Sequence, residues 1–520
     1  MKTKKHLLAL LLSFALILSI LTGCASDGGS SSQSVDPSER STATDGTGGS
    51  DSPGINFDEP PYEINFLYWV ASEGANQQKV AEAVSELALR ELNMSVNLIP
   101  MTIGTYFAQI SLMLAANESL DLFPVMSNNF STYIESQYIV NMHDYLQYAP
   151  DAMRVLGSDA LVADIGGFLT GFTQMKERAY PAGLIVRKDI FEELGYSVSD
   201  FDVNVNDYSS FDKLTEMFAN VKENYPGMIP FDGSSIMGLQ VGSYIDNMGS
   251  NFGVLENYGQ TTTVTNWFES DQFRIFCEIA RDWFVNGYSS SDIAVNQDSG
   301  EIKMMAGNCF SYMSNVKPNT DVEKLAQTGY EVVVIPVSEV MKYTGAVTAA
   351  VYSIANASKD PAKAMQFLNW TYVNGEFNDL INWGIEGEDW IRTPEGLAAY
   401  PPGVDANSVG YHNNFGWIYP NQFAGTPWEG NPIDIWQQYE IYNSNLMVSE
   451  SYGFTFDSTP VFNEEAMLNT VFDQYSDDVA FGAVEIEPAL KAFNDALYAA
   501  GLQRVIDEKQ KQLDDWLANR

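Results

Sequence analysis

The fold of this chain is decided by its first regular stretch, Ile64-Asn65-Phe66-Leu67-Tyr68-Trp69-Val70. This apolar and aromatic run predicts a buried strand, and Asn76 can cap a helix that follows it. We expect a second strand over residues 95–101, a second helix over 105–116 and a third strand over 120–125. The order strand, helix, strand, helix, strand predicts a parallel sheet, because each crossover needs a helix to return the chain.

The ends of these strands give the first candidate ligand-binding residues. Ligands of open α/β sheets lie outside the carboxyl ends of the strands. Trp69 stands at the end of the first strand, and Asp121 and the Ser127-Asn128-Asn129 loop accompany the third. Trp69 and Asn128 are therefore expected near a ligand.

Helices and strands continue to alternate to about residue 370, and a helical tail follows. Ser209 or Ser210 is expected to cap one helix, and another should follow Asp360-Pro361. The remaining expected segments are strands or extended runs at 168–172, 182–186, 309–314, 331–336 and 348–355, and helices at 189–195, 270–286, 488–500 and 502–517.

The N-terminus predicts export and anchoring. Lys2, Lys4 and Lys5 precede an apolar run over residues 7–21, which has the length of a signal peptide rather than of a spanning helix. The run ends in Leu21-Thr22-Gly23-Cys24, which resembles the lipobox of bacterial lipoproteins. That resemblance implies a signal peptide over residues 1–23 and a lipid on Cys24. The alternative is an ordinary secretory signal that happens to hold a cysteine.

A tether is expected after the lipidated cysteine, over residues 24–59. Up to Gly54 it is dominated by Ser, Gly, Asp and Thr and carries no aromatic residue. Such a segment cannot bury enough apolar surface to offset its chain entropy, so it is expected to be disordered. Anchor and tether together predict a globular body held at the outer face of a cell membrane.

The composition excludes some classes of partner. The 520 residues are 45% hydrophobic, enough for at least two buried domains. Removing the three lysines of the signal peptide leaves 24 basic and 68 acidic residues, a formal net charge of −44. Nucleic acid is not expected as a partner, because phosphate binding needs basic patches. The same charge argues against a body that lies on anionic lipid.

Neither a metal nor a cofactor is expected. The mature chain holds two histidines, His143 and His412, and lacks HExxH and CxxC motifs, P-loops and G-x-S-x-G or G-x-G-x-x-G sequences. Asp200, Asp202, Asn204 and Asn206 alternate like calcium ligands, but Val205 and Phe211 stand where a calcium loop needs glycine and an acid, so a solvated turn is expected. A disulfide between Cys277 and Cys309 is allowed outside the cell, but the sequence does not decide whether it forms.

The stretch from Trp370 to Trp436, here called the aromatic segment, holds six of the ten tryptophans and many glycines and prolines. It predicts short elements joined by rigid loops. Many large rings on loops either cap a core or line a cleft. Together they favour carbohydrate, since indole faces cover the C–H face of a sugar, whereas core packing is the alternative for each single ring. Trp370 lies in a helical pattern and is assigned to the core, whereas Trp383 and Trp417, beside glycines, are assigned to loops at a cleft. Trp428 and Trp436 stay unassigned.

An enzyme is the main alternative to a binding protein. A glycosidase needs two carboxylates about 5 to 10 Å apart, and Glu386 with Glu388 is the first pair to consider. Among 68 acids some pair is inevitable, so the signal has little specificity. We interpret these acids as exposed loop residues or as acceptors for a ligand.

The sequence also resembles a known family. Asp360-Pro361-Ala362-Lys363-Ala364-Met365-Gln366-Phe367-Leu368-Asn369-Trp370, followed by Asn382-Trp383-Gly384-Ile385-Glu386-Gly387, resembles extracellular solute-binding proteins of carbohydrate-uptake ABC transporters. Within that family it is similar to the long lipoprotein branch of Gram-positive bacteria, which has a conserved C-terminal domain. Glu118-Ser119-Leu120-Asp121 and the region 168–181 depart from the usual pattern, so the identity of the ligand is not carried over.

The resemblance implies an α/β fold of the periplasmic-binding-protein type (class II), with two lobes, a hinge and a helical C-terminal tail. Lobe one is expected over 60–172 plus 350–440 and lobe two over 173–349 plus 441–520. The crossings are expected near 172–185 and 343–352, with a return near Tyr439. The ligand would lie in the cleft, and closure would be a hinge motion.

The combined expectation is a monomeric, lipid-anchored component of an ABC importer that binds an oligosaccharide and delivers it to the permease subunits without covalent chemistry. A surface glycosidase and a peptide- or lipid-binding sensor are the alternatives. No catalytic residue is assigned. The expected ligand-binding residues, chosen by loop position and ring chemistry, are Trp69, Asn128, Tyr180, Trp383, Glu386 and Trp417.

Overall fold

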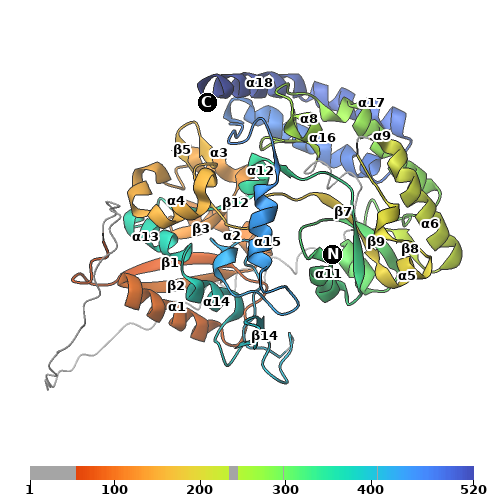
Figure 1. Ribbon diagram of the computed structural model, residues 1–520. Helices are drawn as coiled ribbons and strands as arrows, with labels where there is room; N and C mark the ends of the chain where they lie inside the picture. Colours follow the sequence, from red (N-terminus) through yellow and green to blue (C-terminus); the bar gives the residue numbers. More distant parts are fainter. Residues whose placement is uncertain (1–53, 206, 234–243, 297, 407) are drawn as a thin grey trace, which may run out of the picture. The chain divides into compact units, whose positions relative to one another are not determined.

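The computed structural model describes residues in the ranges 54–205, 207–233, 244–296, 298–406 and 408–520 (Figure 1). The predicted signal peptide, Cys24 and the tether up to residue 53 lie outside the described residues, and so does Asn206. Within the described ranges, no helix is long and apolar enough to cross a membrane.

The first sheet has the strand order β2-β1-β3-β12-β6. β1 pairs in parallel with both β2 and β3, so the predicted parallel arrangement of these three strands is confirmed. β12 is antiparallel to β3 and β6, which brings the chain back into this sheet after residue 349. The strands are β1 (Tyr62–Trp69), β2 (Met94–Met101), β3 (Leu122–Met126), β6 (Phe172–Thr173) and β12 (Ala350–Ile354).

Two helices, α1 (Gln77–Leu92) and α2 (Ile103–Ala115), connect the first three strands. α1 lies beside β1 and β2 in Figure 1 and buries its apolar side, including Val84. Asn76 precedes α1 as expected, but its side chain makes no capping bond. Its amide donates instead to Asp389 Oδ1 at 2.6 Å, which ties the start of α1 to the aromatic segment.

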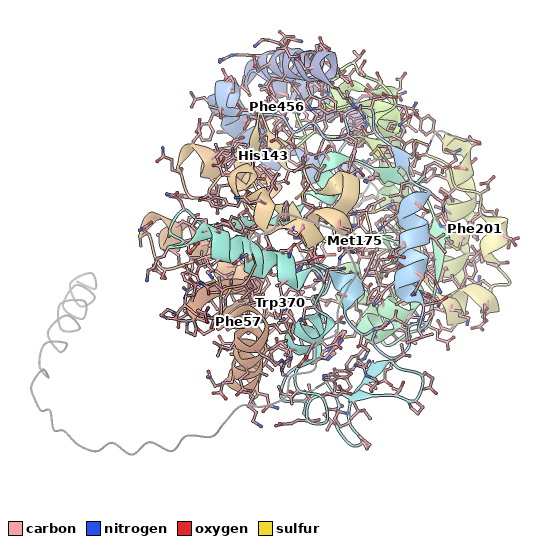
Figure 2. All side chains as sticks on the ribbon, turned by 60° about the vertical axis from the view of Figure 1, so that its left-hand side comes forward. Phe57, His143, Met175, Phe201, Trp370 and Phe456 are labelled. Carbon is pink, nitrogen blue, oxygen red and sulfur yellow. The ribbon has the colours of Figure 1, made fainter. Side chains whose placement is uncertain are left out.

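Further helices of this half are α3 (Phe130–Glu135), α4 (Pro150–Leu156), α13 (Pro361–Thr371) and α14 (Gly375–Trp383). Asp360 caps α13, because its carboxylate accepts a hydrogen bond from Lys363 N at 3.1 Å. Trp370, labelled in Figure 2, is buried as predicted, and its Nε1 donates to Glu91 at 2.8 Å.

The second sheet has the order β10-β7-β9-β8. β7 is antiparallel to β10 and β9, and β8 is parallel to β9. Its strands are β7 (Ala182–Arg187), β8 (Ile229–Phe231), β9 (Cys309–Asn315) and β10 (Val332–Pro336). The helices in this part of the chain are α5 (Lys188–Glu193), α6 (Asp212–Asn224), α8 (Glu256–Gly259), α9 (Asp271–Val285), α10 (Gly300–Met305) and α11 (Thr320–Thr328).

The expected serine cap of α6 is wrong. Tyr208–Phe211 forms a 3-10 turn directly before the helix, and α6 has no side-chain cap. The cap belongs to that turn, where the carboxylate of Asp207 accepts from Ser209 N at 3.1 Å. Asp207, which precedes the serines, accepts the hydrogen bond from the free backbone N–H of Ser209. Neither serine side chain is therefore needed as a cap.

The C-terminal helices are α16 (Phe462–Ala480), α17 (Ile486–Ala499) and α18 (Leu502–Asn519), which lie together in Figure 1. α17 and α18 were expected, and Gly501 with φ of 106° separates them. α16 was not predicted, although it is the longest of the three. It fully buries only Leu468 and Val479, so its sequence lacks a continuous apolar stripe.

The described chain has two large hydrophobic cores. One is built from residues 64–172 and 350–419, and the other from 182–346 and 454–513. Cys277 and Cys309 are buried and free, so they do not form the disulfide left open above. Burial raises the pKa of each thiol to about 12. The exact lobe boundaries stay a prediction.

Shorter elements occupy the connections. β11 pairs with β15, β13 with β14, and β4 with β5. α15 carries Tyr439, where the return between lobes is expected. These elements are β4 (Asp164–Ile165), β5 (Phe168–Leu169), β11 (Met341–Lys342), α12 (Thr344–Val347), β13 (Ile391–Arg392), β14 (Ala398–Ala399), α15 (Ile435–Ser444) and β15 (Met447–Val448).

Candidate functional site

A cavity of about 360 Å³, here called the first cavity, is the centre of the candidate site. The aromatic segment contributes Trp383, Trp417, Trp428 and Trp436 to its lining. Residues 317–327, which include most of α11, contribute the charged residues Lys317 and Glu323. A cavity of this size with rings and a few polar groups is typical of a small-molecule site.

Trp383 is the last residue of α14, not a loop residue as expected. Gly384 ends the helix with φ of 88°, a conformation that favours glycine, and a Cβ there would lie 2.5 Å from Asp389 Oδ2. The indole Nε1 of Trp383 donates to Thr426 O at 2.9 Å, and its ring lies 4.8 Å from that of Trp428. The helix end therefore fixes the orientation of the Trp383 ring at the cavity.

Trp428 and Trp436, which the sequence left unassigned, both line the first cavity. Trp436 donates from Nε1 to Gly425 O at 2.7 Å and stacks on Phe423 with ring centroids 5.5 Å apart. Trp428 packs with Trp383 and Trp390 in a small separate cluster. Both rings are thus held by the segment itself, before any ligand binds.

His412 lies inside this ring cluster. Its imidazole is 4.5 Å from the ring of Trp428, 5.1 Å from that of Tyr400 and 5.2 Å from that of Trp383. Burial lowers the pKa of His412 to about 4, so the imidazole is neutral at pH 7. The cluster beside the cavity is therefore uncharged.

Trp417 joins the first cavity to the end of β1. Its ring is 6.3 Å from that of Trp69, which is only 2% exposed. Trp69 Nε1 has no hydrogen-bond partner among the described residues. Trp69 does not itself line the first cavity, but it lies directly behind one of its walls.

The segment from Gln174 to Pro181, here called the connecting segment, leads from β6 in the first sheet to β7 in the second. Lys176 in this segment lies 5.6 Å from the ring centroid of Trp417 and 4.8 Å from that of Tyr180. Its Nζ also donates a hydrogen bond to the Tyr180 hydroxyl. The structure thus places the predicted residues Trp417 and Tyr180 around one cation, and Trp69 packs against Trp417.

Burial and neighbouring charges shift the pKa values of Lys176 and Glu177. Burial lowers the pKa of Lys176 to about 8, although Glu177 acts in the opposite direction. Burial alone would raise the pKa of Glu177, but Lys317 and Lys176 more than offset it, and the pKa is lowered. Lys317 lies 3.5 Å from Glu177 and 3.3 Å from Glu323, and it lines the first cavity. Lys317 and Glu323 come from sequence far from the aromatic segment, and no local motif marked them.

Two acceptors at the first cavity are free to bind a ligand. Asn382 Oδ1 and Gln422 Oε1 have no hydrogen-bond partner among the described residues, and both side chains line the cavity. Gly416 lies between them, since a Cβ there would be 3.1 Å from Gln422 Cγ and 3.5 Å from Asn382 Oδ1. A buried acceptor without a donor costs free energy, so a ligand hydroxyl or N–H would be favoured here.

Two other predicted residues lie apart from this set. Glu386 is exposed, is not among the lining residues of the first cavity, and lies 3.7 Å from Arg392. Glu388, its partner in the glycosidase alternative, forms an ion pair with Lys79 instead. Asn128 belongs to the 3-10 turn after β3, and its side chain lies outside the described part of the chain. Across that part, no group of three or more His, Cys, Asp or Glu residues is placed to hold a metal ion.

Asp159 anchors the connections between the two sheets. Its carboxylate lies 3.1 Å from Arg178 of the connecting segment and 2.6 Å from Lys342, and it accepts a hydrogen bond from the Tyr452 hydroxyl. Burial raises the pKa of Asp159, but these cations and hydrogen bonds outweigh it, so its pKa is lowered. One buried anion therefore binds three segments that are distant in sequence.

Comparison with protein-family models gives two matches. Residues 82–384, more than half of the chain, match the family described as "Bacterial extracellular solute-binding protein". Residues 450–518 match a "Domain of unknown function (DUF3502)". A curated relative from Streptococcus pneumoniae, described as "Carbohydrate ABC transporter substrate-binding protein", is 23% identical over 87% of this chain and 91% of its own.

Solved structures show the same fold. The N-glycan transport solute binding protein NgtS from S. pneumoniae matches with a TM-score of 0.75 and 18% identity, over 88% of this chain and 99% of that one. The S. pneumoniae protein FusA in complex with kestose matches with a TM-score of 0.58 and 13% identity, over 88% of this chain and all of the other.

These matches confirm the two-lobe α/β fold and the family that the sequence resembles. The match to NgtS spans nearly its full length, and the match to the family model spans the second sheet, α14 and every strand of the first sheet except β1. The chain belongs to the bacterial extracellular solute-binding protein family.

Proposed function

We propose that this protein is the substrate-binding component of an ABC importer, that it holds an oligosaccharide in the first cavity, and that it delivers this sugar to the permease subunits. The observation that carries the proposal is a cavity with four indole rings, two acceptors without partners and the charged pair Lys317 and Glu323. Rings cover the C–H faces of a sugar, while polar groups bind its hydroxyls.

The similar proteins support the same class of ligand. NgtS has been solved in complex with Man1GlcNAc and with Man5GlcNAc, and FusA in complex with kestose. These are different sugars held by the same fold. They support an oligosaccharide as the class of ligand for this chain, but they do not indicate which sugar it binds. The identity of the sugar depends on the residues of this cavity.

The N-terminus would keep the protein near the permease. A lipid on Cys24 and the tether up to residue 59 would hold the monomeric folded body at the outer face of the cell membrane. Ligand contacts to both lobes would stabilise a closed form that docks on the permease. The chain's family is one of binding proteins, and the proposed cycle contains no covalent step.

The glycosidase alternative has no support in the geometry. Glu386 and Glu388 are both exposed and are each paired with a different cation, Arg392 and Lys79. The hydrogen bond from Lys79 lowers the pKa of Glu388, whereas a glycosidase needs one carboxyl that stays protonated. Release of reducing ends from a polysaccharide would be the result that revives this alternative.

Calorimetric titration of the full chain with Man1GlcNAc, Man5GlcNAc, kestose and an alginate oligosaccharide tests the proposal. At least one sugar should bind, and Trp383→Ala and Trp417→Ala should each weaken that binding at least tenfold, about 1.4 kcal/mol. Tyr498→Ala on α17, a partly exposed ring outside the cavity, is the control and should bind like the parent.

Two results would contradict the proposal. If both tryptophan variants bind as tightly as the parent, the first cavity is not the site. If no sugar binds and a peptide library raises the melting temperature instead, the protein is a peptide-binding sensor.

A further inference from the structure

We propose that the C-terminal domain, residues 450–518, supplies one wall of a second half of the ligand site. A sugar chain held in the first cavity would pass Trp417 and Phe107 and continue into a second cavity beside this domain. The inference rests on the proposed function and adds to it the length of the ligand and a role for the domain of unknown function.

The second cavity has a volume of about 650 Å³. Part of its lining comes from the carboxyl end of β3 and the helices beside it, through Ser127, Phe107 and Phe130. Another part comes from residues 455–469 of the C-terminal domain. Phe456, labelled in Figure 2, belongs to this second part and is buried. The cavity therefore lies between the first sheet and the C-terminal domain.

A row of aromatic rings connects the two cavities. Trp417 lines the first cavity and Phe107 lines the second. Trp69 lies between them, with ring centroids 6.3 Å from Trp417 and 6.0 Å from Phe107. Trp69 is only 2% exposed, so it supports from behind the two rings that a sugar chain would contact, Trp417 and the 52% exposed Phe107.

The chemistry of the second cavity fits uncharged sugar units. Its polar lining consists of hydroxyls and amides together with two acids, Glu135 and Glu465, and no Lys or Arg is among the described residues that line it. Thr455 Oγ1 is buried there without a hydrogen-bond partner among those residues. Hydroxyl groups of a neutral sugar would satisfy such a lining, whereas a phosphate or carboxylate would be repelled by Glu135 and Glu465 and would find no cation among the described lining residues.

The C-terminal domain also fixes the neighbouring wall. Lys509 on α18 is fully buried, and its Nζ donates to the carbonyl oxygens of Asn247 at 3.2 Å, Ser250 at 2.9 Å and Gly253 at 2.8 Å. Ser250 Oγ donates in turn to Glu465 at 2.8 Å. The loop from 247 to 252 is thereby held in place before a ligand binds, which reduces the entropy cost of binding.

Titration calorimetry with two pairs of sugars tests the inference in the full chain. The pairs are Man1GlcNAc with Man5GlcNAc, and kestose with fructo-nystose, so that length changes within one chemical type. The variants are Phe462→Ala, 62% exposed, and Asn469→Ala, also exposed, both on α16 at the second cavity. Met467→Ala on the same helix, 49% exposed and outside the lining, is the matched control.

In the pair that binds, the longer sugar should bind at least tenfold more tightly than the shorter one. Phe462→Ala and Asn469→Ala should remove most of that advantage, and Met467→Ala should leave it intact. Equal affinities for the two lengths, or an advantage that survives both variants, would overturn the inference. In either case a loss of binding in Trp417→Ala would still support the proposed function. Failure of all four sugars to bind would overturn the inference, and it would overturn the proposed function as well if the alginate oligosaccharide also failed to bind.

Discussion

The aromatic segment lines the first cavity and the connecting segment lies beside it, but the groups that the two segments bury differ in kind. In the aromatic segment the indoles of Trp383 and Trp436 donate to backbone carbonyls, and His412 is neutral. In the connecting segment Lys176, Glu177 and Arg178 are at most 5% exposed and carry charges. One region buries rings, and the other buries ion pairs.

This difference predicts how substitutions in each segment affect the protein. Buried rings gain free energy from the area they remove from water, and a lost ring costs that free energy and leaves a cavity, but it leaves no charge without a partner. A buried charge is stable only while its partner is present, so the loss of one partner leaves the other uncompensated. We therefore expect the aromatic segment to control affinity and the connecting segment to control stability.

Asp159→Asn should have the largest effect. It removes the anion beside Arg178 and Lys342 and leaves two largely buried cations without a full counter-charge. The expected loss is about 3–5 kcal/mol in the free energy of unfolding, measured by urea denaturation.

The control for this variant is Asp495→Asn, which breaks the exposed pair with Lys491 on α17 and should cost less than about 0.5 kcal/mol. A loss below about 1 kcal/mol in Asp159→Asn would contradict the expectation and make the connecting segment as tolerant as the aromatic segment.

Acidification should destabilise the aromatic segment through His412. Its pKa is lowered to about 4 in the folded chain, below the ordinary value of 6.5, so between these pH values the unfolded chain binds a proton that the folded chain does not. Stability is therefore lost as the pH falls, by about 2 kcal/mol from pH 7 to pH 5.

His412→Gln is the comparison for this measurement. Urea denaturation of both proteins at pH 7 and pH 5 separates the histidine from the many carboxylates, which titrate in both. The variant should lose about 2 kcal/mol less than the parent over this interval, and parallel losses would show that the imidazole is not kept neutral by burial.

Glu386→Gln should have the smallest effect. The carboxylate is exposed, lies 3.7 Å from Arg392, and is not part of the lining of the first cavity. Calorimetry should show a change in sugar affinity of less than twofold. A tenfold loss would return Glu386 to the ligand-binding residues expected from the sequence and would extend the site beyond the first cavity.

Local sequence patterns predicted much of the first sheet and the helix after Asp360-Pro361, but the predicted caps, Asn76 and Ser209 or Ser210, were wrong. β1, β2 and β3 followed from their apolar runs, and the capping of α13 by Asp360 needs only residues within one turn. The side chain of Asn76 went to Asp389 instead of to its own helix, because a distant partner competed with the local one. α16 was missed because its buried residues are too few to form a stripe.

The candidate site was predicted only in part. Trp383 and Trp417 were chosen by ring chemistry and do line the first cavity, although the role of every predicted residue in binding stays a prediction. Lys317 and Glu323 were missed, because nothing in their own neighbourhood differs from an ordinary helix start. They reach the cavity because the tertiary structure places residues 317–327 and the aromatic segment around the same cavity.

The sequence by itself determined the class of this protein: an α/β chain with an aromatic segment and a net charge too negative for nucleic acid. Only the tertiary structure decided which rings surround a cavity, that Lys176 lies against Trp417 and Tyr180, and that Asp159 joins three distant segments. The physical reason is the separation along the sequence of the residues that interact. Strand and helix patterns arise from neighbours within a few residues, whereas a binding site depends on contacts between segments hundreds of residues apart.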